Sequence, residues 1–223
     1  MYHSIGGKVT GETGAEIYSV AIGKFKEQLE LIKQQDEIIT FDDGLEDNFT
    51  NAYPVLKDLG LRAYFFVIPD KIETKGYMNW KQAKELVASG MIIGSHGMTH
   101  RILTELNDSE LDYELRESKR LLEEKLGITI EYFSVPRGFC NARVISVAKN
   151  IGYKNIFTSN PKDNNGYCIG RIAVKDSWNI KHFTKVITSG LTLGDRIEGA
   201  AKNTAKSLLG AKFYDKLRTR LLK

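Results

Sequence analysis

The sequence predicts an α/β protein with a parallel sheet, and two observations support that prediction. Short runs rich in β-branched and aromatic residues alternate along the 223-residue chain with longer segments of helical periodicity. Alternating β and α elements favour parallel strands that are joined by right-handed crossovers. The runs also lack a strict alternation of apolar and polar residues, which suits strands covered on both faces. Periodicity alone leaves a closed (β/α) barrel and an open doubly wound sheet as alternatives.

The individual elements follow from composition and end signals. The expected strands are 37–41, 62–68, 91–95, 131–135, 155–159 and 168–174, with room for one more near the N-terminus. The expected helices are 23–35, 48–60, 79–90, 108–126 and 141–151. The fourth helix has the strongest signals, because Asn107 or Asp108 can cap its start, leucines recur at helical spacing, and Gly127 follows its last turn.

Composition describes an ordinary soluble globular chain with a basic end. The chain is 42% hydrophobic and 27% charged, and it has two cysteines, so neither disorder nor a disulfide framework is expected. No leader or spanning segment is visible, which favours a cytoplasmic protein. Residues 195–223 hold eight Lys or Arg against three Asp or Glu. We therefore expect a domain over 1–194 and a basic amphipathic helix over 195–223, which is either docked on the domain or facing the inner side of a membrane.

Three polar clusters follow three of the expected strands. They are DDG at 42–44, SH at 95–96 and PRG at 136–138. Active sites of parallel α/β folds lie at the carboxyl ends of the strands. We therefore expect the three clusters to converge on one mouth.

Four side chains in this region suit a hydrolytic metal site: Asp42, Asp43, His96 and His100. Two imidazoles and one carboxylate leave a position open for water, which is the usual form of a catalytic zinc centre. The second carboxylate can then act as general base on that water. Gly44 permits a turn after which the two aspartates diverge. Each motif alone has a plainer explanation, a turn for the aspartates and a surface helix for the histidines.

Three segments occur in order between about residue 36 and residue 175: ITFDDGLEDNFTNAYPVLKDLGLRAYFFVIP, MIIGSHGMTHRILTEL and YFSVPRGF. Together they resemble the polysaccharide deacetylase family (carbohydrate esterase family four, with the NodB-homology domain). The resemblance implies a distorted, incomplete (β/α) barrel, TIM-like, of about seven strands. It also implies a metal-dependent removal of N-acetyl groups from amino sugars, with Asp42 as the general base. The ligands of Zn²⁺, or of another divalent metal, would be Asp43, His96 and His100.

The third segment departs from the family pattern. Many members have an arginine that orients the base where this chain has Ser134. Either Arg137 or Arg171 can replace it by pairing with Asp42, and the plainer alternative for each is a surface arginine. The resemblance further implies that Pro136, Arg137 and Gly138 border the substrate, with a backbone N–H near Arg137 or Gly138 for the oxyanion.

The acid that protonates the departing amine is unassigned by the sequence. The late family motif that ends in a histidine is not recognisable, and only His182 lies in that part of the chain. His3, at the end of the expected N-terminal strand, is the second candidate.

These observations predict a metal-dependent N-deacetylase that acts on an N-acetylated glycan or a lipid-linked glycan intermediate, during assembly of a cell-surface polysaccharide. One alternative is an amidohydrolase with a small non-sugar substrate, and another is a catalytically weak glycan-binding protein on the same fold. No nucleic-acid-binding signature is present.

Overall fold

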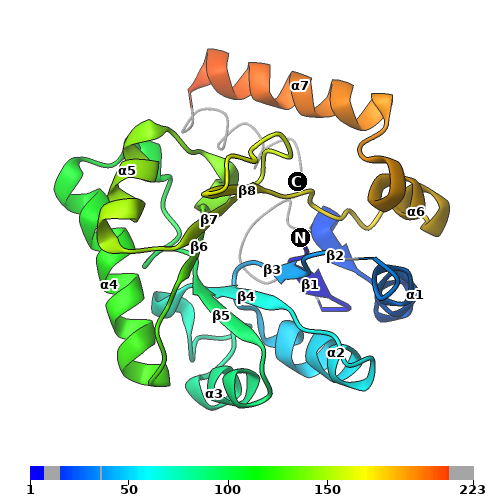
Figure 1. The fold of residues 1–223 in the computed structure, drawn as a ribbon, viewed down its shortest axis with the longest axis horizontal. Coiled ribbons are helices and arrows are strands. Elements are labelled where there is room, and N and C mark those ends of the chain that lie inside the picture. The colour runs from blue at the N-terminus through cyan, green and yellow to red at the C-terminus, as the bar shows by residue number, and fades with distance from the viewer. Residues whose placement is uncertain (8–15, 36, 211–223) are drawn as a thin grey trace.

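A computed structural model describes residues 1–7, 16–35 and 37–210, and its centre is a parallel sheet (Figure 1). Six strands pair in chain order, and all of them run parallel. They are β3 (Thr40–Phe41), β4 (Tyr64–Val67), β5 (Ile92–Ser95), β6 (Tyr132–Ser134), β7 (Asn155–Thr158) and β8 (Cys168–Gly170). Two further strands form a separate parallel pair, β1 (Ser4–Ile5) and β2 (Ser19–Val20). Each of the six predicted strands contains one strand of the sheet, and β1 is the additional strand near the N-terminus.

The first two residues connect the edges of the six-stranded sheet. The Tyr2 N–H donates to the Thr40 carbonyl at 2.7 Å, and the Tyr2 carbonyl accepts from the Asp42 N–H at 3.0 Å. On its other side, the Met1 carbonyl accepts from the Val174 N–H at 3.0 Å, beyond the end of β8. The sheet therefore curls into a barrel, although β8 and β3 do not pair directly in the part of the chain that the structure describes. This arrangement confirms the distorted, incomplete (β/α) barrel and rules out the open doubly wound sheet.

Helices lie around the outside of this barrel (Figure 1). They are α1 (Ile22–Ile32), α2 (Tyr53–Asp58), α3 (Trp80–Ala88), α4 (Asp108–Leu126), α5 (Ala142–Ile151) and α6 (Ile180–Ser189). Short helical turns precede or follow the strands: η1 (Glu16–Tyr18), η2 (Asn48–Ala52), η3 (Pro69–Lys71), η4 (Leu103–Glu105) and η5 (Pro136–Gly138). The five predicted helices are confirmed, except that the segment 48–60 begins as the π-helical turn η2 before it continues as α2.

The end signals of α4 act as the sequence indicates. The Asn107 side chain accepts from the Glu110 N–H at 2.9 Å, and the Glu110 carboxylate accepts from the Asn107 N–H at 3.0 Å. This reciprocal pair satisfies two N–H groups that the first turn leaves without helical partners. Gly127 ends the helix in the left-handed region, with φ +69°. Of the two predicted caps, Asn107 is therefore the one in use.

Aromatic rings fill the barrel below its mouth. The rings of Phe66 and Phe157 lie 5.0 Å apart, and the Arg171 guanidinium lies 5.3 Å and 5.6 Å from their centroids. Gly94 on β5 leaves room for this arrangement, because a Cβ there would come within 2.5 Å of the Phe66 ring. A filled interior restricts chemistry to the carboxyl ends of the strands.

The last described helix, α7 (Leu193–Leu209), begins close to the predicted boundary at 194/195 and ends at Gly210, which has φ +71°. Its Glu198 carboxylate lies 2.5 Å from Lys175 Nζ on the barrel side. Leu193 and Ile197, one turn apart, are 75% and 62% exposed. The second half of the predicted basic helix, 211–223, lies outside the described residues. Over 1–7, 16–35 and 37–210, no helix is both long and apolar enough to cross a membrane.

Candidate active site

The two aspartates and two histidines singled out by the sequence meet at the carboxyl ends of β3 and β5. Asp43 Oδ1 lies 3.4 Å from His96 Nε2 and 3.5 Å from His100 Nε2. One ligand atom from each of these three residues lies within 4.8 Å of the other two. Zinc–ligand bonds of about 2.0–2.1 Å in tetrahedral geometry place ligand atoms ~3.3 Å apart. The donor set and its spacing therefore fit a divalent metal of the zinc type.

The turn after β3 separates the two aspartates. Asp43 has φ +74° and Gly44 has φ +72°, so the chain reverses through two consecutive left-handed residues. A Cβ at Gly44 would lie 2.9 Å from the Val67 side chain and 3.2 Å from its Cα, so a larger residue does not fit there. Asp42 stays 3% exposed and points into the barrel, while Asp43 reaches the histidines. The divergence expected of these neighbours is present.

His96 is oriented by a backbone carbonyl. Its Nδ1 lies 2.8 Å from the Ser134 carbonyl oxygen. Because a carbonyl only accepts, Nδ1 carries a proton, and Nε2 is the nitrogen that faces Asp43. This is the arrangement in which metal-binding histidines are usually found. The His96 side chain is 3% exposed, so it stays in this orientation.

His100 reaches the same point from an irregular loop rather than from a helical turn. It has φ +66°, and Gly97 in the same loop has φ +77°. The two histidine rings lie 5.0 Å apart at an interplanar angle of 44°. Two left-handed residues, rather than a helical turn, therefore bring the rings of His96 and His100 together.

Asp42 is held by Arg171 in a buried two-point ion pair. Arg171 Nη1 donates to Asp42 Oδ1 at 2.7 Å, and Nη2 donates to Asp42 Oδ2 at 2.9 Å. Nη2 also donates to Ser134 Oγ at 2.7 Å, and Nη1 to Thr40 Oγ1 at 3.1 Å. Ser134 Oγ in turn donates to Asp42 Oδ2 at 3.1 Å. Of the two arginines considered for this place, Arg171 is the one in contact with Asp42.

These contacts determine the charge of the site. Burial alone would raise the pKa of Asp42, but the Arg171 guanidinium and the neighbouring histidines outweigh it and hold that pKa at about 2. The pKa of Asp43 is also lowered, because the hydrogen bond from His96 and the charges of His100 and His3 outweigh burial. Burial opposes a charge on His96, yet the two carboxylates raise its pKa. A site that favours a cation on an imidazole favours a metal cation for the same reason.

The two acid candidates lie in different places. His3 precedes β1, its ring stacks on Tyr18 at 5.0 Å, and its carbonyl accepts from Asn48 Nδ2 at 2.5 Å. Burial lowers the pKa of His3, and the charges of Asp43 and Asp42 act against that shift, which places His3 within electrostatic range of the pair.

His182 lies on α6 instead. Its ring centroid is 4.8 Å from that of Trp178, and its Nε2 is 3.2 Å from Asp195 Oδ2 on α7. The groups that shift the pKa values of the aspartate pair include His3, and His182 is not among them.

The segment 136–138 forms the helical turn η5, one residue after the end of β6. Arg137 and Gly138 are both left-handed, with φ +56° and +69°. Pro136 packs on the histidine loop, since a Cβ at Gly97 would lie 3.3 Å from the Pro136 ring. The Gly138 N–H donates to the Val135 carbonyl at 3.4 Å, within its own turn. The oxyanion donor expected near Arg137 or Gly138 stays a prediction.

Ser134 was the main residue that sequence reasoning undervalued. Its hydroxyl contacts both members of the ion pair and its carbonyl orients His96. The available signal was its position next to the end of the predicted strand 131–135, two residues before the PRG cluster at 136–138.

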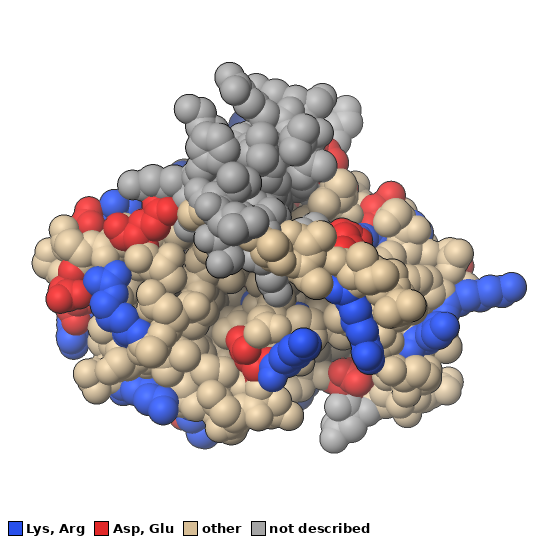
Figure 2. Space-filling model, turned by 90° about the horizontal axis from the view of Figure 1, so that it is seen from above, with Lys and Arg blue, Asp and Glu red and all other residues tan. Residues whose placement is uncertain are grey.

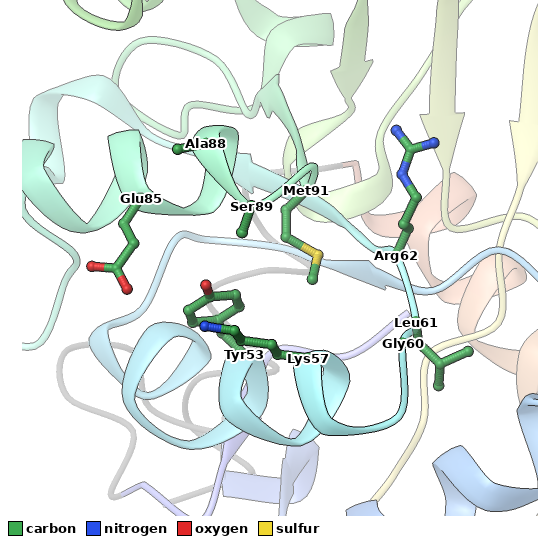
Figure 3. A pocket seen from close by; sticks show the side chains of 9 residues that line it. All are labelled: Tyr53, Lys57, Gly60, Leu61, Arg62, Glu85, Ala88, Ser89 and Met91. Carbon is green, nitrogen blue, oxygen red and sulfur yellow. The ribbon is translucent and has the colours of Figure 1, made fainter.

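Two hollows lie away from the aspartate–histidine cluster. One has a volume of roughly 520 Å³ and is lined by Tyr53, Lys57, Glu85 and residues that precede β4 and β5. It lies between α2 and α3 (Figure 3). It therefore opens at the amino ends of the strands, on the opposite edge of the sheet. A second hollow, of roughly 330 Å³, is lined mainly by apolar residues beside α6. Arg171 also lines it, but the two aspartates and two histidines do not.

Comparison with known proteins places these residues in a family. The family model described as polysaccharide deacetylase matches residues 33–156. YxkH of Bacillus subtilis (strain 168), which is named for the same family, is 32% identical over 156 residues, covering 68% of this chain and 56% of its own. The peptidoglycan-N-acetylglucosamine deacetylase of Bacillus cereus is 28% identical over 129 residues, covering 56% and 58%. The chain thus spans little more than half the length of these two relatives.

A third relative matches a longer stretch. The poly-beta-1,6-N-acetyl-D-glucosamine N-deacetylase of Staphylococcus aureus (strain MRSA252) is 24% identical over 200 residues, covering 71% of this chain and 69% of its own. Among solved structures, the Streptococcus pyogenes deacetylase PplD in complex with acetate superposes with a TM-score of 0.74 at 23% identity, covering 83% of this chain and 95% of that one. At that identity the superposition establishes a shared fold.

Proposed function

Since the chain belongs to the polysaccharide deacetylase family, we propose that it hydrolyses N-acetyl groups from the amino sugars of a glycan. The observation that carries the proposal is a buried, ionised carboxylate, Asp42, next to a three-donor metal site that does not need it as a ligand. Two relatives are named for polymers that contain N-acetylglucosamine, one for peptidoglycan and the other for poly-beta-1,6-N-acetyl-D-glucosamine. A polymer of this kind, or a lipid-linked intermediate of its assembly, is the substrate class that we propose.

Asp43, His96 and His100 would hold the metal, and we propose zinc. When bound, such a metal supplies Lewis acidity to the acetamide carbonyl. The protein's own contribution is the fixed direction of its donors: the Ser134 carbonyl sets the tautomer of His96, and the left-handed turn at Asp43 aims that carboxylate at both rings.

Asp42 acts as the general base in this proposal. It takes a proton from the water that attacks the acetamide carbon, while Arg171 and Ser134 keep its two oxygens in place. A pKa of about 2 keeps the carboxylate ionised at neutral pH. A proton must then reach the nitrogen as the C–N bond breaks, so that acetate and a free amine leave.

We assign that second proton transfer to His3. The charges of both aspartates act on the pKa of His3, whereas His182 is engaged by Asp195 and Trp178 on the α6–α7 side.

Two alternatives predict different reactivity. An amidohydrolase with a small non-sugar substrate would use the same side chains, and it would release no acetate from N-acetylglucosamine oligomers. A catalytically weak glycan-binding protein has no use for the Asp42–Arg171 pair, because a buried ion pair removed from water carries a large desolvation penalty.

The deciding experiment combines metal analysis with acetate release from N-acetylglucosamine oligomers. Wild type is expected to contain zinc and to release acetate. Asp42→Asn is expected to retain the metal without activity, and His96→Ala to lose both. An active Asp42→Asn enzyme would contradict the assignment of the base.

We further propose a cytoplasmic protein that touches the inner membrane face through residues 195–223. Supporting this, Leu193 and Ile197 of α7 face solvent while Glu198 faces the barrel. Four of the five net positive charges of 195–223 lie in 211–223 (five Lys or Arg, one Asp). In Figure 2, basic and acidic side chains of the described residues are interspersed, so no continuous basic surface is visible among them in this view.

Co-sedimentation with vesicles tests the membrane contact. Binding to anionic vesicles, with little binding to zwitterionic ones, is expected for the full chain and should be lost on deletion of 195–223. Unchanged binding after the deletion would remove the proposal.

A further inference from the structure

The loop that carries both histidines is held by a buried carboxylate outside the metal site. Glu114 on α4 is 1% exposed. Its Oε2 accepts from the Met98 N–H at 2.9 Å and from the Thr99 N–H at 2.9 Å. Its Oε1 accepts from the Thr99 hydroxyl. Three donors between the two histidines thus converge on one side chain.

The backbone geometry explains why the loop requires such an acceptor. Gly97 and His100 are left-handed, so the residues between them make no helical or strand ladder that would satisfy their N–H groups. A buried N–H without an acceptor is destabilising, because it loses its hydrogen bond to water and gains none in the protein. The approach is close, since a Cβ at Gly97 would lie 3.2 Å from Glu114 Oε2. The Met98 carbonyl is in turn held by the Asp70 N–H at 3.2 Å.

A second side chain of α4 holds the other end of the same loop. Ser118, one helical turn after Glu114, is fully buried, and its Oγ lies 2.7 Å from Ser95 Oγ. Ser95 Oγ accepts from the Gly97 N–H at 3.2 Å. The inward face of α4 is otherwise made of leucines, so these two polar residues interrupt an apolar stripe where they meet the loop.

We propose that Glu114 is a positioning residue for the metal site: its hydrogen bonds keep His96 and His100 aimed at Asp43. The proposal rests on the metal site of the proposed function but not on the identity of the substrate. Residues that orient metal ligands by hydrogen bonds, without binding the metal themselves, typically weaken metal affinity by about 10–100-fold when they are removed.

The test is the Zn²⁺ dissociation constant, measured by competition with a chromophoric chelator, together with the visible spectrum of the Co²⁺ form. Glu114→Ala is expected to weaken Zn²⁺ binding by about 10–100-fold and to alter the Co²⁺ spectrum. Glu114→Gln should keep most of the affinity, since its carbonyl oxygen can accept from both amides and its NH₂ can donate to Thr99 Oγ1. The matched control is Glu117→Ala on the same helix, whose side chain is 31% exposed and pairs with Arg120.

Glu114→Asp covers the case in which the alanine variant fails to fold. It keeps the charge but withdraws the carboxylate by one methylene, so weaker Zn²⁺ binding is again expected. A wild-type dissociation constant in either Glu114→Ala or Glu114→Asp, even with reduced thermal stability, would overturn the proposal. Acetate release by the wild type is read separately: tight Zn²⁺ binding that depends on Glu114 but yields no acetate would reject the proposed function and leave this inference intact.

Discussion

Asp42 and Arg171 are 129 positions apart in the sequence and meet inside the barrel through two parallel hydrogen bonds of 2.7 Å and 2.9 Å. Both residues are almost fully buried. A carboxylate taken out of water stays ionised only if a charge of opposite sign and good geometry compensates it. The pair therefore joins the last strand of the sheet to the first one through the proposed base.

Removing the arginine should affect both stability and turnover. Arg171→Ala leaves a buried carboxylate without its partner, which lowers the free energy of unfolding by about 3–5 kcal/mol. Arg171→Lys keeps the charge but loses the two-point geometry. Its turnover should therefore fall clearly, while its free energy of unfolding stays closer to the wild-type value than that of Arg171→Ala. Urea unfolding and acetate release measure the two effects. Arg116→Ala, at an exposed pair with Asp112, is the control and should match the wild type; an Arg171→Ala protein that also matches it would contradict the role of the pair.

The ion pair also predicts how stability changes with pH in the metal-free protein. The folded pKa of Asp42 is about 2, below the ordinary value of 3.8. A lowered carboxylate pKa stabilises the fold above pH 3.8, and this contribution of about 2 kcal/mol disappears as the pH falls through 2. The difference in unfolding free energy between wild type and Asp42→Asn should therefore shrink between pH 5 and pH 2. A difference that stays constant over that range would show that folding does not lower the pKa of Asp42.

Replacing the two candidate acids should separate them. His3→Gln is expected to lower kcat by about 10²–10⁴-fold, the usual contribution of a general acid, while Zn²⁺ affinity stays unchanged. His182→Gln should leave kcat near the wild-type value, because its contacts are with Trp178 and Asp195. Steady-state acetate release with both variants decides the matter. The assignment is reversed if the His182 variant, and not the His3 variant, loses activity.

Local signals account for the part of the molecule that the sequence predicts well. Helix α4 begins and ends where predicted, since its capping box and its C-terminal glycine act within a few residues of one another. Strands are placed correctly but are shorter than their apolar runs: only Thr40–Phe41 of 37–41 pairs regularly. In an irregular barrel, the length of the hydrogen-bonded ladder between two strands depends on how the neighbouring strands curve. Amino-acid composition does not predict that curvature.

The choice of Arg171 over Arg137 illustrates the other limit. Both arginines follow strands, and nothing local distinguishes them. Only the closure of the barrel, with residues 1 and 2 between the edges formed by β8 and β3, brings Arg171 to Asp42. Glu114 was missed for a related reason. In the sequence it is one of many glutamates on a charged helix. The informative signal is a pair of polar residues, at 114 and 118, on the leucine-lined face of that helix. This signal can be interpreted only once that face is known to pack on the histidine loop.

Metal removal gives the most direct check on the donor set. Ligand at 100 times its dissociation constant stabilises the folded state by about 2.7 kcal/mol, and each kcal/mol corresponds to roughly 2–4 °C in Tm for a chain of this size. Adding Zn²⁺ to chelator-treated protein should therefore raise Tm by about 5–10 °C. The rise should vanish in His96→Ala and in Asp43→Ala, and it should persist in Asp42→Asn, whose carboxylate is paired with Arg171 rather than offered to the metal. Thermal scans with and without Zn²⁺ measure this, and an Asp42→Asn protein that no longer responds to Zn²⁺ would place Asp42 among the ligands instead of beside them.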